Sequence, residues 1–68
     1  MEIKVKNSKN ISKIYFIESL GELWVFFKSN SVYVYNIDKT IAKNLYDSDE
    51  PSKYFYDNIR NLKYKKIY

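Results

Sequence analysis

The chain has 68 residues and a net charge of +4, contains neither cysteine nor histidine, and is 19% aromatic. This length fits one small domain, placed here at residues 1–68, and the missing residue types exclude disulfides, thiolate or imidazole metal sites, and histidine-based catalysis. A core of this size rarely supplies more than about 3–5 kcal/mol of net stability, so we expect oligomerisation or very efficient packing to support it.

The first part of the chain predicts extended backbone. Residues 2–6, EIKVK, alternate with Ile3 and Val5 on one side and indicate a short extended segment, with an extra N-terminal strand as an open alternative. The run ISKIYFIE at 11–18 is β-branched and aromatic, which predicts a strand. The turn after it holds Gly21, the single glycine, which suits a positive-φ position.

Two further strands are predicted at 22–28 and 32–37, separated by a turn at Ser29, Asn30 and Ser31. A turn of even length would place Tyr33 and Tyr35 on the outer face of the sheet. A three-residue turn would place them on the core face and send the intervening valines outward. We favour the three-residue turn because asparagine accepts the left-handed conformation that a bulged turn requires.

The second predicted strand is apolar on both faces. Leu23, Val25 and Phe27 share one face, which we assign to the helix-covered core, and Trp24 and Phe26 lie opposite. A two-residue turn at Leu20–Gly21 would set two side chains of the preceding strand beside Trp24 and Phe26. The resulting outer patch is too large to be a scatter of exposed residues, and we predict that it is a protein interface. Its members are Tyr15, Ile17, Trp24 and Phe26.

Beyond residue 37 the apolar period changes from two to 3.6. Asp38 is a good N-cap for a helix whose stripe is Ile41, Ala42, Leu45 and Tyr46. Pro51 suits the first turn of a second helix, with Asp49 and Glu50 at its positive end. Its stripe is Phe55, Ile59 and Leu62, and the final KYKKIY is left either loose or as an extension of this helix.

These elements predict an α+β domain. It consists of a three-stranded antiparallel meander, with a short extra N-terminal strand as an open alternative, followed by two C-terminal helices packed on one face. Two helical stripes can cover one face of such a sheet and leave the other uncovered.

The order of VKNS, LWVFF, SNSVYVY and SKYFYDNIR resembles the KTSC domain, a short module found alone in bacterial and phage proteins and at the C-terminus of some lysyl-tRNA synthetases. The likeness covers almost the whole chain. Asn30, Ser31 and Ser52 stand where the family tends to have glycine, so the two turns depart from its pattern. The resemblance supports the architecture and implies RNA binding as a suggested function. The landmarks expected to be structural are Tyr33, Tyr35, Tyr54, Phe55 and Ile59.

The residue pattern favours a binding module over an enzyme. No nucleophile–base spacing or glycine-rich phosphate loop is present, and no cofactor or metal is expected. No apolar run reaches the length of a membrane span and the N-terminus lacks a signal-peptide core, so we expect a cytoplasmic protein without membrane contact.

Basic ends flank a mildly acidic middle, and aromatic residues accompany the lysines. Rings offer faces to bases and lysines follow phosphates, so RNA or single-stranded nucleic acid is the ligand class we expect. Self-association through the outer sheet face accompanies this prediction. The alternatives are a protein-interaction module, such as a phage or mobile-element inhibitor of a host complex, and a protein that sequesters a nucleotide signal. The expected ligand-binding residues are Lys13, Tyr15, Arg60, Lys63, Tyr64, Lys65 and Lys66.

Overall fold

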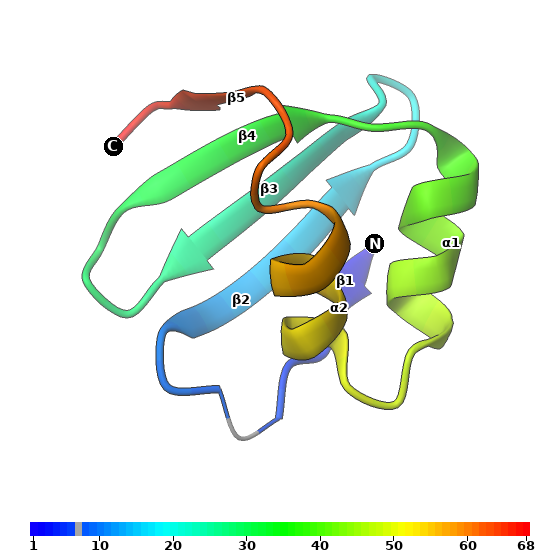
Figure 1. Ribbon diagram of the computed structural model, residues 1–68. Coiled ribbons are helices and arrows are strands. Elements are labelled where there is room, and N and C mark those ends of the chain that lie inside the picture. The colour runs from blue at the N-terminus through cyan, green and yellow to red at the C-terminus, as the bar shows by residue number, and fades with distance from the viewer. Residues whose placement is uncertain (7) are drawn as a thin grey trace.

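A computed structural model describes residues 1–6 and 8–68. Five antiparallel strands form one sheet in the order β1-β2-β3-β4-β5, and two helices are inserted before the last strand (Figure 1). In the described part of the chain, no helix has the length and apolar character needed to cross a membrane. The elements are β1 (Glu2–Ile3), β2 (Ile11–Ile17), β3 (Glu22–Phe27), β4 (Val32–Asn36), α1 (Lys39–Asp47), α2 (Pro51–Asn58) and β5 (Tyr64–Lys66).

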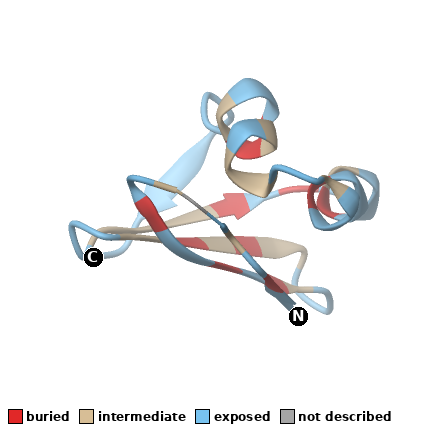
Figure 2. Ribbon diagram, turned by 90° about the horizontal axis from the view of Figure 1, so that it is seen from below, coloured by how far each residue is buried: buried red, intermediate tan, exposed pale blue. Residues whose placement is uncertain are grey.

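Both helices lie on the same face of the sheet, and the core fills the space between them (Figure 2). The predicted assignment of β3 is confirmed, since Leu23 and Val25 are completely buried beneath the helices. Trp24 and Phe26, on the opposite face, are half-buried. The other buried core residues are Ile3, Ile11, Ile14, Phe16, Tyr35, Ile37, Ala42, Leu45, Phe55 and Ile59.

The turn between β2 and β3 is longer than predicted. Ile17 pairs with Glu22, so residues 18–21 form the turn in place of the expected Leu20–Gly21 pair. Gly21 has φ of 64°, as the single glycine suggested. The register therefore differs by two residues, and because side chains alternate with a period of two, every predicted face is preserved.

Strand β2 contains an irregularity that the alternating pattern could not accommodate. Ile11 and Ile14 are both buried, although their spacing along the strand is odd and would set them on opposite faces. The pairing with β3 shifts between Ile11 and Lys13, as in a β-bulge, which returns Ile11 to the core face.

The turn between β3 and β4 has the predicted length. The Phe27 N–H donates to the Ser31 carbonyl at 2.9 Å, and Asn30 takes a left-handed φ of 73°. The turn residues are 28–30, not 29–31, which is again a shift of two in register. Tyr33 and Tyr35 consequently share the core face, opposite Val25 and Leu23 of β3 respectively.

Helix α1 begins as predicted, because the Asp38 carboxylate accepts a 3.0 Å hydrogen bond from the Ile41 N–H. Ala42 and Leu45 are buried. The assignment of Tyr46 to the buried stripe is wrong, since Tyr46 is 54% exposed. Helix α1 buries only Ala42 and Leu45, and Tyr46 lies to one side of this buried face.

Helix α2 has Pro51 in its first turn and buries Phe55, and Ile59 directly after the helix is buried too. The helix is shorter than predicted. The N–H groups of Ile59 and Arg60 both donate to the Phe55 carbonyl at 2.9 Å, which ends the regular pattern. Leu62 is therefore 41% exposed and does not extend the buried stripe.

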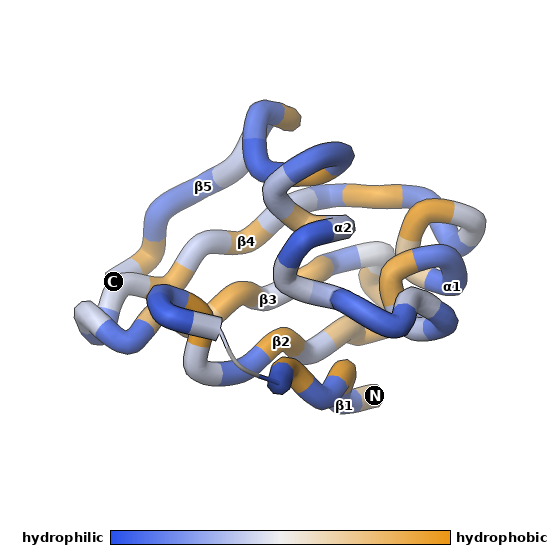
Figure 3. Tube along the Cα trace, turned by 60° about the horizontal axis from the view of Figure 1, so that its bottom comes forward, coloured by the Kyte–Doolittle hydropathy of each residue, from blue (hydrophilic) through white to orange (hydrophobic). Residues whose placement is uncertain are grey.

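The prediction for KYKKIY, a loose end or an extension of the second helix, is wrong. Residues 64–66 form β5, which pairs antiparallel with β4, and the Ile67 N–H donates to the Val32 carbonyl at 2.9 Å. The sheet therefore has five strands where three were predicted: β1 confirms the alternative of a short extra N-terminal strand, and β5 was not predicted. The chain forms both helices before it returns to the sheet as β5 (Figure 1). Strand β5 is hydrophilic along most of its length, unlike β3 (Figure 3). Backbone pairing with the edge of β4, and not the burial of apolar side chains, therefore holds β5 in place.

Candidate functional site

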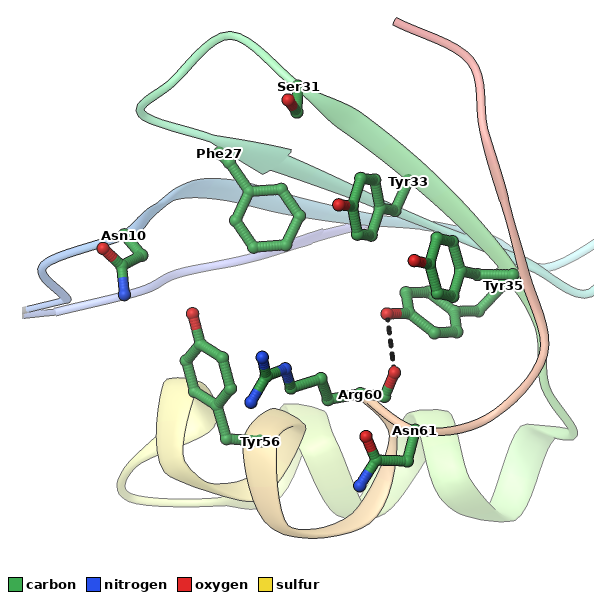
Figure 4. A pocket seen from close by; sticks show the side chains of 9 residues that line it. Asn10, Phe27, Ser31, Tyr33, Tyr35, Tyr56, Arg60 and Asn61 are labelled. Atoms are coloured by element: carbon green, nitrogen blue, oxygen red, sulfur yellow. Dashed lines mark hydrogen bonds between the residues drawn. The ribbon is translucent and has the colours of Figure 1, made fainter.

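A cleft of about 350 Å³ opens between α2 and the neighbouring part of the sheet. Phe27 and Tyr33 project into it from the sheet, and Tyr56 and Arg60 project toward them from α2 and the residues that follow it (Figure 4). Its volume lies at the small end of the range for ligand pockets. The lining residues are Asn10, Phe27, Ser31, Tyr33, Tyr35, Tyr56, Arg60, Asn61 and Tyr64.

One wall of the cleft is a stack of aromatic rings. The rings of Tyr33 and Tyr64 are nearly parallel, 8° apart in plane and 4.4 Å between centroids. Phe27 meets Tyr33 edge-on at 4.9 Å. This wall exists because β5 pairs with β4 and sets Tyr64 opposite Tyr35, on the same face as the helices. Tyr64 remains 46% exposed, so part of its ring stays open to a ligand.

Tyr35 forms the floor of the cleft and anchors its two sides. Its side chain is completely buried, and its hydroxyl donates a 3.1 Å hydrogen bond to the Arg60 carbonyl. Burial, together with the neighbouring phenols of Tyr64 and Tyr33, raises the pKa of Tyr35 to about 12. Tyr35 is therefore neutral at physiological pH and fixes the backbone of Arg60 against β4.

Arg60 supplies positive charge at the cleft. Its guanidinium lies 5.5 Å from the centroid of the Tyr56 ring, a cation–π arrangement. Among residues 1–6 and 8–68, the ion pairs all involve lysines and none involves Arg60. The guanidinium can therefore bind an anionic group without first breaking an ion pair with a carboxylate.

Three lysines flank the cleft on the segment that ends in β5. Lys63 precedes β5, Lys66 lies opposite Tyr33 on the helix-covered face, and Lys65 lies opposite Val34 on the outer face. All three are exposed. No acidic residue occurs in 58–68, so this edge of the sheet carries uncompensated positive charge.

The structure divides the predicted ligand-binding residues between two surfaces. Arg60 and Tyr64 line the cleft, with the three lysines beside it. Lys13 and Tyr15 lie instead on the outer face of the sheet, where the Lys13 ammonium is 5.7 Å from the Tyr15 ring centroid. The residues predicted to bind one ligand therefore do not form one site.

The predicted interface residues do come together. They surround a shallow hollow on the outer face that Lys13 also lines. Trp24 and Phe26 lie 6.3 Å apart between ring centroids, and the Trp24 indole N–H donates to the Glu22 carboxylate at 3.2 Å. This uncovered surface is called the outer patch below and comprises Tyr15, Ile17, Trp24 and Phe26.

Sequence reasoning missed several cleft residues, above all Tyr56. Tyr56 and Arg60 are four positions apart, the spacing that puts two side chains on one side of a helical turn, so the pair could have been found. Asn10 and Asn61 carry no comparable signal, because their approach depends on the packing of distant segments. Tyr33 was expected to be structural, and it contacts the core and also lines the cleft.

The remaining family landmarks lie in or beside the core. Phe55 and Ile59 are completely buried, and Tyr54 is a half-buried residue packed against the core. Phe55 contacts the ring of Tyr35 edge-on, at 5.6 Å between centroids, and so links α2 to the floor of the cleft.

The described residues contain no group of three acidic, histidine or cysteine side chains arranged to hold a metal ion. Tyrosine hydroxyls, amides and one guanidinium line the cleft, and these groups bind and orient planar or anionic ligands. A comparison with curated proteins finds no match. The family model of the KTSC domain matches residues 7–64. The chain therefore belongs to the KTSC domain family, as its sequence pattern indicated.

Proposed function

We propose that this domain is a non-enzymatic module that binds single-stranded nucleic acid at the cleft between α2 and β5. One unstacked base enters the cleft, and the phosphates on either side of it follow the lysines of the β5 segment. The observation that carries the proposal is the meeting of an aromatic cleft, an arginine without an ion-pair partner among the described residues, and an edge strand with lysines and no acids.

The chemistry of the cleft suits a nucleobase. The Tyr33–Tyr64 pair is already stacked at 4.4 Å, so a base does not fit between these rings and instead faces them from the side of Tyr56. The hydroxyls of Tyr33 and Tyr56 and the amides of Asn10 and Asn61 can donate or accept hydrogen bonds along the edge of a base.

The charges favour a polyanion over a neutral ligand. Arg60 and the lysines of the β5 segment lie along one edge of the molecule, and an extended strand that passes the cleft meets them in turn. Lys65 points to the other face, but β5 is the last strand of the sheet, and a flexible lysine reaches around such an edge. The backbone contacts are electrostatic and carry no sequence information.

Salt dependence tests this proposal. A fluorescently labelled single-stranded oligoribonucleotide should bind with an affinity that falls steeply as salt is added, because each phosphate contact releases counterions. At about 0.7 per contact, the four cations of the segment predict a log–log slope of about −2.8. Fluorescence anisotropy at several salt concentrations gives this slope.

An oligodeoxyribonucleotide and a mononucleotide serve as comparison ligands in the same titration. Absence of oligonucleotide binding, or binding indifferent to salt, contradicts the proposal. A mononucleotide that binds as tightly as the oligonucleotide also contradicts it and favours sequestration of a nucleotide instead.

A further inference from the structure

The outer face of the sheet is left uncovered by the helices, which both lie on the other side (Figure 2). Strand register shows that its apolar side chains are contiguous. Tyr15, Trp24 and Val34 lie directly opposite one another on three adjacent strands, and Phe26 lies opposite Val32 in the next row. Tyr15 is 39% exposed and the others are half-buried, so an apolar surface several strands wide faces solvent.

This surface has opposite charges at its two ends. Lys13 lies opposite Phe26, and its ammonium sits 5.6 Å from the centroid of that ring. Glu22 lies opposite Ile17 and accepts the hydrogen bond from the Trp24 indole. Four residue steps along the strands, about 13 Å, separate the rows of Lys13 and Glu22. The two charges therefore do not pair within one chain, and the described ion pairs include neither.

We propose that two copies of the chain associate through this surface, outer face against outer face, about a twofold axis that runs across the strands above Trp24. Such an axis exchanges the two ends of the patch. Lys13 of each chain then meets Glu22 of the other, and the two Trp24 side chains meet near the axis. Packed sheets lie about 10 Å apart, which side chains of this size fill.

The charge arrangement selects both the occupant and the orientation. A surface with a cation at one end and an anion at the other is complementary to its own rotated copy, which an unrelated protein need not be. A twofold axis along the strands would instead set the two Glu22 carboxylates against each other within the patch. The proposed axis brings like charges together only at the two edges of the sheet, where Glu2 and Lys65 lie in the row of Trp24 and are exposed to solvent. Burying the patch also adds apolar contact to a core of only 68 residues, where oligomerisation is a common source of stability.

The dimer leaves the cleft free. The cleft lies on the helix-covered face and the dimer contact on the opposite one, so the two clefts of a dimer face away from each other. Of the residues proposed to bind nucleic acid, only Lys65 lies on the outer face, at the edge of the dimer contact. Loss of the dimer therefore leaves the cleft, Arg60, Lys63 and Lys66 in place.

Charge reversal tests the arrangement. Lys13→Glu and Glu22→Lys should each raise the dimer dissociation constant about tenfold or more, because every dimer then contains two contacts between like charges. An equimolar mixture of the two variants should dimerise like the wild type. In the mixed dimer, one chain carries glutamate at both positions and the other carries lysine at both, so each contact again joins opposite charges. Sedimentation equilibrium of the separate variants and of the mixture measures this.

Lys43→Glu is the matched control for Lys13→Glu, because it makes the same change in net charge on α1, away from the outer face. It should leave the dissociation constant unchanged. Circular dichroism of each variant checks that the fold is retained. A wild-type chain that stays monomeric at high micromolar concentration overturns the proposal. So does a mixture that associates no better than the separate variants.

Discussion

Replacing Lys63, Lys65 and Lys66 together by glutamine should weaken binding of single-stranded RNA by about 100-fold at 0.1 M salt. Each lysine that contacts a phosphate contributes about 0.7 to the magnitude of the log–log salt slope, so loss of three lowers it by about 2. The substituted side chains are exposed on the β5 segment, and the fold should survive. Anisotropy titrations at several salt concentrations give both the affinity and the slope.

The chain offers a control with the same change in net charge. Lys39, Lys43 and Lys53 lie on the helices and pair with Glu18, Asp47 and Asp57 respectively, outside the cleft. Replacing these three by glutamine should leave the affinity within a few-fold of the wild type. Equal losses in the two triple variants would show that binding follows total charge and that the β5 segment has no special part in it.

The free energy of unfolding should fall as the pH rises from 10 to 12, and Tyr35 should cause a distinct part of that fall. The pKa of Tyr35 is raised from 10.0 to about 12 by burial, with smaller contributions from Tyr64 and Tyr33. Between these pH values the unfolded chain loses this proton and the folded chain keeps it. The folded state therefore binds more protons and its stability declines with increasing pH, by at most about 3 kcal/mol from this group.

Tyr35→Phe isolates this contribution. At pH 8 the variant should be less stable than the wild type by about 1 kcal/mol, because the Arg60 carbonyl loses the hydrogen bond from the Tyr35 hydroxyl. Lysines and the other tyrosines titrate in both proteins, so they largely cancel in the difference. Urea denaturation at a series of pH values should show the two stabilities converging above pH 10 and crossing at about pH 10.7, where ionisation of Tyr35 in the unfolded chain has cost the wild type about 1 kcal/mol. Curves that stay parallel across this range would contradict the assignment.

Local patterns were sufficient to predict the helices and the two faces of the central strands. Asp38 caps α1, Asn30 takes the left-handed position in a turn of the predicted length, and Val25 and Trp24 lie on the predicted sides of β3. Each of these features depends on residues close together in sequence. Apolar alternation and turn chemistry therefore predict them directly.

The strand register could not be predicted from the sequence, for a physical reason. Both turns differ from the prediction by a shift of two residues in pairing, and a shift of two moves no side chain to the other face. The distribution of apolar residues is the same in either register. Only the packing of particular side chains, such as Tyr35 opposite Leu23, distinguishes the two.

Strand β5 could not be predicted because its residues carry no buried side chain. Tyr64, Lys65 and Lys66 are all exposed, so no apolar alternation marks them as a strand. Hydrogen bonds to β4 define the strand, and these depend on the chain returning to the sheet after α2. The cleft was missed for the same reason, since the Tyr33–Tyr64 stack joins residues that this return brings together.

The two proposed surfaces together suggest how a short domain gains affinity. A dimer through the outer patch presents two clefts on opposite sides, so one long strand or two separate strands can be held by the same particle. Linking two weak sites raises the apparent affinity for a ligand that spans them, without any new contact.

The most direct test of nucleic-acid binding at the cleft is an NMR titration of isotope-labelled protein with a single-stranded oligoribonucleotide. We predict that the largest chemical-shift changes fall on the backbone amides of Tyr33, Tyr56, Arg60 and Tyr64, with smaller changes along 65–68. Changes concentrated instead on Tyr15, Trp24 and Phe26, with the cleft residues unmoved, would contradict binding at the cleft and place the ligand on the outer face of the sheet.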